Sequence, residues 1–292
     1  MPELKVPADV LLGNAARAFS QAISTESAEH IKPFHRYLAM RFVIEGGFHP
    51  TDIRPRPPLM ANFRDGNWYL SFEPDVEDER EQIVLGALKS KRIDLVVSKE
   101  GIGPVLAVSV KGTIRAFRNL VNRTEEAIGD CANIHIMYPG LVYGFVHFLK
   151  ATDPNDRELK PNDKSVDPNG DAVPAIKAYA KILEGLAGRR LVRNDYARYE
   201  GVGLALVKTK TGKRENPLLA VFPTPESPLT LNACFAALYQ TYDLRFPYTY
   251  TDPILKHLIR AEWHADSPAL AGLRKMEATG EPLGYSARTT AG

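Results

Sequence analysis

Two short apolar runs and the helical segment after them, within residues 93–126, most constrain how this chain can fold. The first run is IDLVV at residues 93–97, and the second extends from Val105 to Lys111 after a turn that contains Gly and Pro. Short β-branched runs separated by turn residues are typical of adjacent strands in a hairpin. We therefore expect Asp94 and Lys111 to meet at one end of a sheet.

A carboxylate and an ammonium group placed together can serve phosphate chemistry. The carboxylate can hold Mg²⁺ against a phosphate, and the ammonium can orient water or offset developing charge. Proteins usually hold Mg²⁺ through one or two carboxylates, so a second acid is expected near Asp94. The position two residues before Lys111 is Ser109, which cannot supply that charge.

The helical segment after the second run offers the missing acid. On a helical wheel with Phe117 at zero, a buried stripe lies within roughly 60° and consists of Leu120, Val121, Thr124 and Ile128. Glu125 falls at about 80° and Glu126 at about 180° on the same wheel. We therefore expect Glu125, and not Glu126, to lean toward Asp94 and Lys111 as the second metal ligand.

A family resemblance rests on Asp94, on Ser109-Val110-Lys111 and on Glu125, which follows the lysine after thirteen intervening residues. The arrangement resembles the variant PD-(D/E)XK motif of type II restriction endonucleases in the CCGG-recognising group. In that group a serine or similar residue replaces the second acid, and a helical glutamate takes over its role. The resemblance implies a restriction-endonuclease-like fold, with Asp94, Lys111 and Glu125 as catalytic residues and Mg²⁺ held by Asp94 and Glu125.

The same family carries an Arg-Ser-Asp-Arg recognition segment that begins four residues after the lysine. This chain has Arg115-Ala116-Phe117-Arg118 there, so both arginines match and the aspartate does not. A polar face is the default for any amphipathic helix, but Arg and Asn can also make bidentate contacts to base edges. We expect DNA contacts from Arg115, Arg118, Asn119 and Asn122. Phosphate contacts are the more natural role for a second basic cluster, Arg189, Arg190 and Arg193.

Composition places the chain among globular proteins. It has 292 residues, of which 44% are hydrophobic and 25% charged, and a formal net charge of +2, which does not by itself announce a nucleic-acid partner. Cys131 and Cys234 show neither disulfide nor zinc-site spacing. No signal peptide or membrane-spanning run is evident, so a cytoplasmic location is expected.

Periodicity outlines the elements before the central hairpin. Residues 11–23 and 29–44 have helical spacing, and Asn67 to Phe72 has the character of a strand after the Asp65-Gly66 turn. A helix with acids in its first turn is expected from Asp75. Acids in a first turn commonly interact with the helix dipole, so three possible extra metal ligands stay outside the expected site: Glu77, Glu79 and Glu81.

Later segments complete an α/β pattern. Residues 133–137 are expected as a strand, residues 141–149 as a strand or short helix, and residues 151–174 as a long loop. Further strands are expected at residues 201–208 and 218–222. Helices are expected at residues 175–186, 229–242, 253–263 and 268–278.

The whole pattern predicts an α/β fold with a mixed β-sheet flanked by helices and a mixed α/β C-terminal part. Residues 1–60 would form an N-terminal helical segment packed on a core of residues 61–292. The expected function is a Mg²⁺-dependent, sequence-specific endonuclease acting on double-stranded DNA as a homodimer, or a tetramer. Alternatives are a PD-(D/E)XK nuclease of repair or recombination with little sequence preference, and a non-catalytic DNA-binding protein.

Overall fold

A five-stranded mixed sheet forms the centre of the protein in the computed structural model, which describes residues 6–22, 28–115, 117–153, 155–156, 158–190, 192, 195–246 and 257–290. The side chains of Ala28 and Arg118 also fall outside the description. In spatial order the strands are β1 (Ile53–Arg54), β6 (Leu95–Lys99), β7 (Gly103–Thr113), β8 (Val142–Ala151) and β9 (Gly201–Lys208). The first three are antiparallel, and β7, β8 and β9 are parallel. The carboxyl ends of these three strands therefore share one edge of the sheet.

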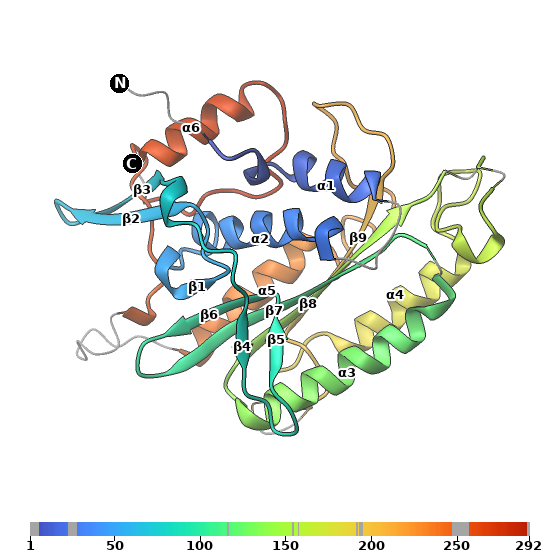
Figure 1. The fold of residues 1–292 in the computed structure, drawn as a ribbon, viewed down its shortest axis with the longest axis horizontal. Coiled ribbons are helices and arrows are strands. Elements are labelled where there is room, and N and C mark those ends of the chain that lie inside the picture. Colours follow the sequence, from blue (N-terminus) through green and yellow to red (C-terminus); the bar gives the residue numbers. More distant parts are fainter. Residues whose placement is uncertain are drawn as a thin grey trace.

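Helices cover both faces of this sheet (Figure 1). One apolar cluster joins the sheet to α1 (Leu12–Gln21), α2 (Lys32–Ile44) and α5 (Leu231–Arg245). The other cluster joins it to α3 (Leu120–Met137) and α4 (Pro174–Leu186), which connect the parallel strands. Neighbouring residues of β7 divide between the clusters, with Val108 in the first and Ala107 in the second, as alternation along a strand requires. The predicted mixed sheet flanked by helices is confirmed.

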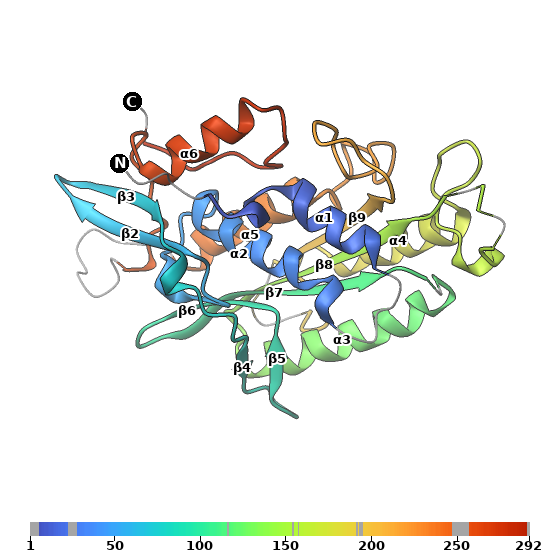
Figure 2. The same cartoon turned by 45° about the horizontal axis from the view of Figure 1, so that its top comes forward.

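Several local predictions are confirmed as well. The two N-terminal helices are α1 and α2, and α6 (Pro268–Glu277) ends the described helices. A hairpin of β2 (Leu59–Arg64) and β3 (Asn67–Phe72) extends away from the sheet (Figure 2). Its turn residues Asp65 and Gly66 both have positive φ, the backbone conformation that suits a two-residue hairpin turn.

The expected helix after Asp75 is wrong. The structure has a short 3-10 turn at Pro74–Val76, followed by a second hairpin of β4 (Gln82–Val84) and β5 (Lys91–Ile93). Ile83 is 63% exposed, so the apolar spacing of this segment does not mark a buried helical face. The hairpin is held from outside by Asn133 of α3, whose Oδ1 accepts the backbone N–H groups of Leu88 and Lys89.

Three other element predictions also differ from the structure. Residues 133–137 are the last residues of α3 and not a strand. Asn133 and His135 are buried there through hydrogen bonds to the carbonyls of Lys89 and Tyr196. Residues 218–222 form only one bridge, between Leu218 and Val207. Of the expected helix at residues 253–263, residues 253–256 lie outside the described part and residues 257–263 contain no α-helix. No helix in the described ranges is long and apolar enough to cross a membrane.

Candidate metal centre

Asp94 lies at the bend between β5 and β6, beside the carboxyl-terminal part of β7. Its Oδ2 accepts the backbone N–H of Val110 at 2.7 Å, which fixes the carboxylate against β7 next to Lys111. The side chain is 18% exposed. The hydrogen bond leaves Oδ1 available for a second interaction.

His35 of α2 faces this second oxygen of Asp94. It lies on α2, its residue is 4% exposed, and its Nε2 is 3.8 Å from Asp94 Oδ1. At that separation Nε2 is a buried polar atom without a hydrogen-bond partner. Such atoms are rare in native proteins and call for an explanation, of which an ion bound there is one.

Glu81 completes the cluster from the residue just before β4. Its Oε1 is 3.5 Å from Nδ1 of His35. The interaction with His35 holds the pKa of the Glu81 carboxyl below its usual value despite partial burial, and Arg92 and Lys32 act in the same direction. Glu81 is therefore a carboxylate at neutral pH.

His35, Glu81 and Asp94 can each offer one ligand atom, and these atoms lie within 4.8 Å of one another. Two carboxylates and one imidazole suit a divalent cation such as Mn²⁺ or Mg²⁺, with the imidazole favouring Mn²⁺ relative to a set made of oxygen alone. The unpartnered Nε2 of His35 fits this interpretation. A cavity of about 70 Å³, lined by His35 and Glu81, adjoins the cluster and provides room for an ion and water.

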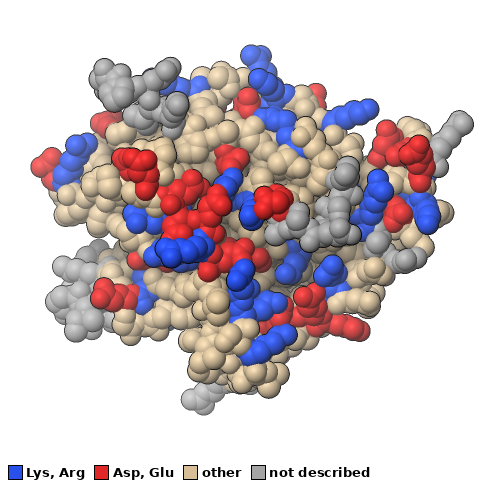
Figure 3. Space-filling model, in the orientation of Figure 1, with Lys and Arg blue, Asp and Glu red and all other residues tan. Residues whose placement is uncertain are grey.

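An acidic arm, residues 73–81, runs past this cavity. Arg36 of α2 forms ion pairs with two residues of the arm, Glu77 at 3.7 Å and Glu79. It also pairs with Asp9 at 3.3 Å. Burial raises the pKa of the Glu77 carboxyl. Figure 3 shows acidic side chains gathered in the middle of this face, with Lys and Arg among them. The cations Lys32, Arg36 and Arg56 line the same cavity as these acids, so the acidic charge there is partly neutralised.

Lys111 lies one residue beyond the N–H that anchors Asp94. It is half-buried and, among the described residues, forms no ion pair with Asp94 or any other acid. Its charge acts on His147, its partner in β8, whose pKa falls to about 3 through burial, Arg123 and Lys111. Ser109 is buried and shares a 2.8 Å hydrogen bond with Tyr143, so it serves packing and does not face the cluster as a ligand.

The structure does not bring Glu125 into this cluster. The residue is exposed on α3 and makes no hydrogen bond or ion pair with the described part of the chain. The expected buried stripe is partly wrong, because Val121 is 54% exposed. The buried stripe instead follows Leu120, Thr124, Ala127, Cys131 and Ile134. A catalytic role for Glu125 stays a prediction without a contact to support it.

The expected DNA-contacting residues lie around the start of α3. Arg115 follows β7 and is exposed, as are Asn119 and Asn122. The side chain of Arg118 lies outside the described residues. Their role in DNA contact stays a prediction.

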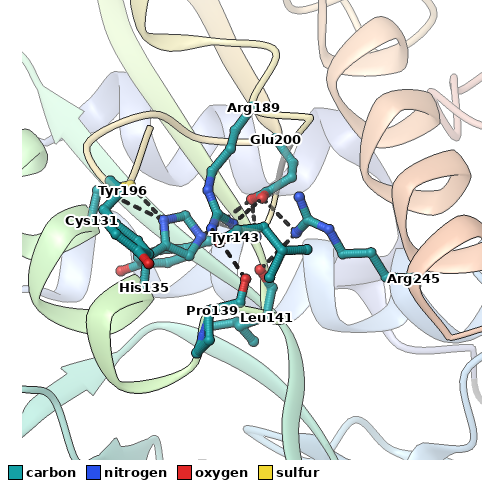
Figure 4. A network of polar contacts seen from close by, with 10 residues as sticks. Cys131, His135, Pro139, Leu141, Tyr143, Arg189, Tyr196, Glu200 and Arg245 are labelled. Atoms are coloured by element: carbon teal, nitrogen blue, oxygen red, sulfur yellow. Dashed lines mark hydrogen bonds and ion pairs between the residues drawn. The ribbon is translucent and has the colours of Figure 1, made fainter. Parts of the chain in front are cut away.

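The second basic cluster does not behave as expected. Arg189 is fully buried and donates to Glu200 at 2.8 Å, and Figure 4 shows both at the centre of a polar network. Arg245 and His135 reach the same carboxylate, at 2.5 and 3.4 Å. Arg189 is therefore a structural side chain and not a phosphate contact. Arg190 is exposed, and Arg193 lies outside the described residues.

Sequence reasoning missed His35 and set Glu81 aside. His35 occupies a helix whose other residues read as core, and Glu81 was assigned to the first turn of a helix that does not form. Residues 73–81 are rich in Asp and Glu, which indicates that an acid of this segment could bind a cation. Which acid lies next to His35 depends on where α2 packs.

Comparisons with protein-family models, curated proteins and solved structures give no match to this chain. The resemblance to the CCGG-recognising restriction enzymes therefore rests on Asp94, Lys111 and the residues around them alone.

Proposed function

We propose that this protein is a divalent-metal-dependent nuclease that hydrolyses phosphodiester bonds in double-stranded DNA at specific sequences. The observation that carries the proposal is the cluster of His35, Glu81 and Asp94, which offers three ligand atoms within 4.8 Å, with Asp94 bonded to the backbone N–H of Val110, the residue before Lys111. The motif resemblance at Asp94 and Lys111 adds the substrate class. In this proposal Glu81 takes the place that the sequence pattern gives to Glu125.

Each residue has a distinct role in the proposed reaction. His35, Glu81 and Asp94 would hold Mn²⁺ or Mg²⁺, and the metal would supply Lewis acidity toward a phosphate oxygen. The Val110 N–H orients Asp94, so that Oδ1 faces His35. Lys111 orients the attacking water and offsets the charge that develops as the phosphorus–oxygen bond to water forms and the bond to the leaving oxygen breaks.

The test begins with metal binding, because contacts among His35, Glu81 and Asp94 do not by themselves require a metal. Calorimetric titration of the metal-free protein with Mn²⁺ should give one site per chain. Asp94→Asn, which can keep the contact with Val110, and His35→Ala should each weaken binding by at least tenfold. Glu79→Gln is the matched control in the arm and should bind like wild type, since Glu79 pairs with Arg36 and lies outside the cluster.

The second step is cleavage of supercoiled plasmid with Mg²⁺, with Mn²⁺ and without metal. Discrete fragments support the proposal, whereas a smear indicates a nuclease with little sequence preference. Intact DNA with a shift in gel mobility indicates a non-catalytic DNA-binding protein. Lys111→Ala should bind metal normally and lose cleavage, so wild-type cleavage by Lys111→Ala or Asp94→Asn would contradict the assigned roles.

A further inference from the structure

A second cavity, of about 290 Å³, lies between α1 and the chain that follows β9. Three cationic residues line it: Arg17 from α1, and Lys208 and Lys210 from the end of β9 and the loop after it. Hydroxyl-bearing residues complete the polar part of the lining, namely Ser20, Thr209 and Thr211. No Asp or Glu belongs to the lining in the part of the chain that the structure describes.

Two carboxylates lie beside this cavity. Glu281 is 3.8 Å from Arg17, which also donates to Asn14 Oδ1, and Glu215 accepts the backbone N–H of the lining residue Gly212 at 3.2 Å. Lys208 donates to the backbone carbonyl of Asn216 at 3.0 Å, a neutral acceptor. Lys210 is exposed and, within the described ranges, has no acidic partner. Three cations outnumber the two carboxylates, so the recess attracts an anion.

Further cations continue this positive region along the same edge of the sheet. Lys150 lies at the carboxyl end of β8 and donates to the carbonyl of Ala22, the residue after α1. Arg115, after β7, is close enough to lower the pKa of Lys150, in addition to the larger effect of burial. Cations therefore follow the ends of three parallel strands: Arg115 for β7, Lys150 for β8, and Lys208 with Lys210 for β9.

We infer that the cavity between α1 and residues 208–212 binds a phosphate group, with Arg17 and Lys210 as its main cationic contacts. Guanidinium, ammonium and hydroxyl groups are the usual hydrogen-bond donors to phosphate oxygens. The cavity offers all three kinds of group. The source of the phosphate rests on the proposed function, which makes it a backbone phosphate of DNA away from the bond that is cut. A free phosphorylated compound would offer the same chemistry.

The first test measures binding of a labelled DNA duplex in EDTA over a range of salt concentrations, so that neither metal nor cleavage enters. Lys210→Gln should weaken binding to all duplex sequences alike and reduce the slope of log K against log salt by about one. The Arg17→Gln, Lys210→Gln double variant should reduce it by about two. Lys210→Arg should retain binding, and Lys275→Gln on α6 is the control for loss of one exposed cation outside the cavity.

The second test titrates the metal-free protein with inorganic pyrophosphate in a calorimeter. Binding that is lost in Lys210→Gln while duplex binding is unchanged assigns the cavity to free phosphorylated compounds. Loss of duplex binding alone assigns it to DNA. If Lys210→Gln and the double variant leave both ligands bound as in wild type, the inference is wrong. Failure of the proposed nuclease would appear separately, as absence of metal binding or cleavage with this binding intact.

Discussion

His147, the partner of Lys111 in β8, is a histidine whose two ring nitrogens both have hydrogen-bond partners. It is fully buried in β8, with Nδ1 2.7 Å from the Tyr179 hydroxyl and Nε2 2.9 Å from the Thr113 hydroxyl. Burial, followed by the charges of Arg123 and Lys111, lowers its pKa to about 3. The ring is therefore neutral in the folded protein, next to the charges of Arg123 and Lys111.

His147 should make the stability of the folded protein depend on pH. Because His147 stays neutral in the folded protein and gains a proton in the unfolded chain below its ordinary pKa of about 6.5, stability falls as the pH drops from about 6.5 toward 3. Between pH 7 and pH 5 the loss from this group should be about 2 kcal/mol. Urea unfolding of wild type and His147→Gln at both pH values measures it. Equal losses in the two proteins would contradict the assignment.

Among the elements, the ends of α3, β8 and α5 are joined at Glu200, just before β9 (Figure 4). Its carboxylate accepts from Arg189 and from the Tyr143 N–H, and it pairs with Arg245 of α5 and His135 of α3. Burial alone would raise the pKa of Glu200, but the contacts with His135, Arg245 and Tyr143 together hold it below the usual value. One carboxylate thus links α5 on one face of the sheet to α3 on the other.

Glu200→Gln should lower the free energy of unfolding by about 3–5 kcal/mol, because it leaves two guanidinium groups buried without countercharge. The wild-type contribution should be present above the ordinary carboxyl pKa and disappear as the pH falls through the depressed value, since the unfolded chain then binds the proton more readily. Urea unfolding at neutral pH gives the magnitude. Glu184→Gln, an exposed change on α4, is the control and should be close to neutral.

At the scale of the whole molecule, the two candidate sites lie at different levels of the parallel strands. Asp94 bonds to Val110, which is level with Val146 of β8 and Gly203 of β9, whereas the basic cavity follows Lys208 at the carboxyl end of β9. Under the proposed function, a bound DNA strand would place one phosphate at the metal cluster and another in the cavity.

Under the proposed function, two such sites related by the symmetry of the DNA would let one complex cut both strands of a duplex. A homodimer with two-fold symmetry would supply one site to each strand. We therefore predict a particle of about twice the 32.4 kDa chain mass by sedimentation equilibrium, at least when a duplex is bound. A strictly monomeric complex that nevertheless makes double-strand breaks in one binding event would contradict this prediction.

The sequence alone predicts local elements. Apolar spacing located α1, α2, α4, β3 and β9 closely, and the paired runs located the antiparallel pair β6 and β7. Asp94 bonds to the Val110 N–H there, and its expected meeting with Lys111 stays a prediction. Short-range periodicity and turn residues carry this information, because each element buries a face defined by its own residues. The same reasoning failed at residues 75–93, where the hairpin is stabilised by Asn133 and Asp130 of α3 and not by its own pattern.

The members of the candidate site could not be predicted from the sequence, because they are brought together by packing. His35, Glu81 and Asp94 come from a helix, an irregular arm and a strand end that are distant in the chain, and their meeting depends on how α2 packs over the sheet. The wheel that favoured Glu125 assumed that α3 leans toward Asp94, but α3 packs on the opposite face through Leu120 and Ala127. The sequence shows which chemical groups the chain contains and where along the chain they lie. Packing determines which of these groups face one another.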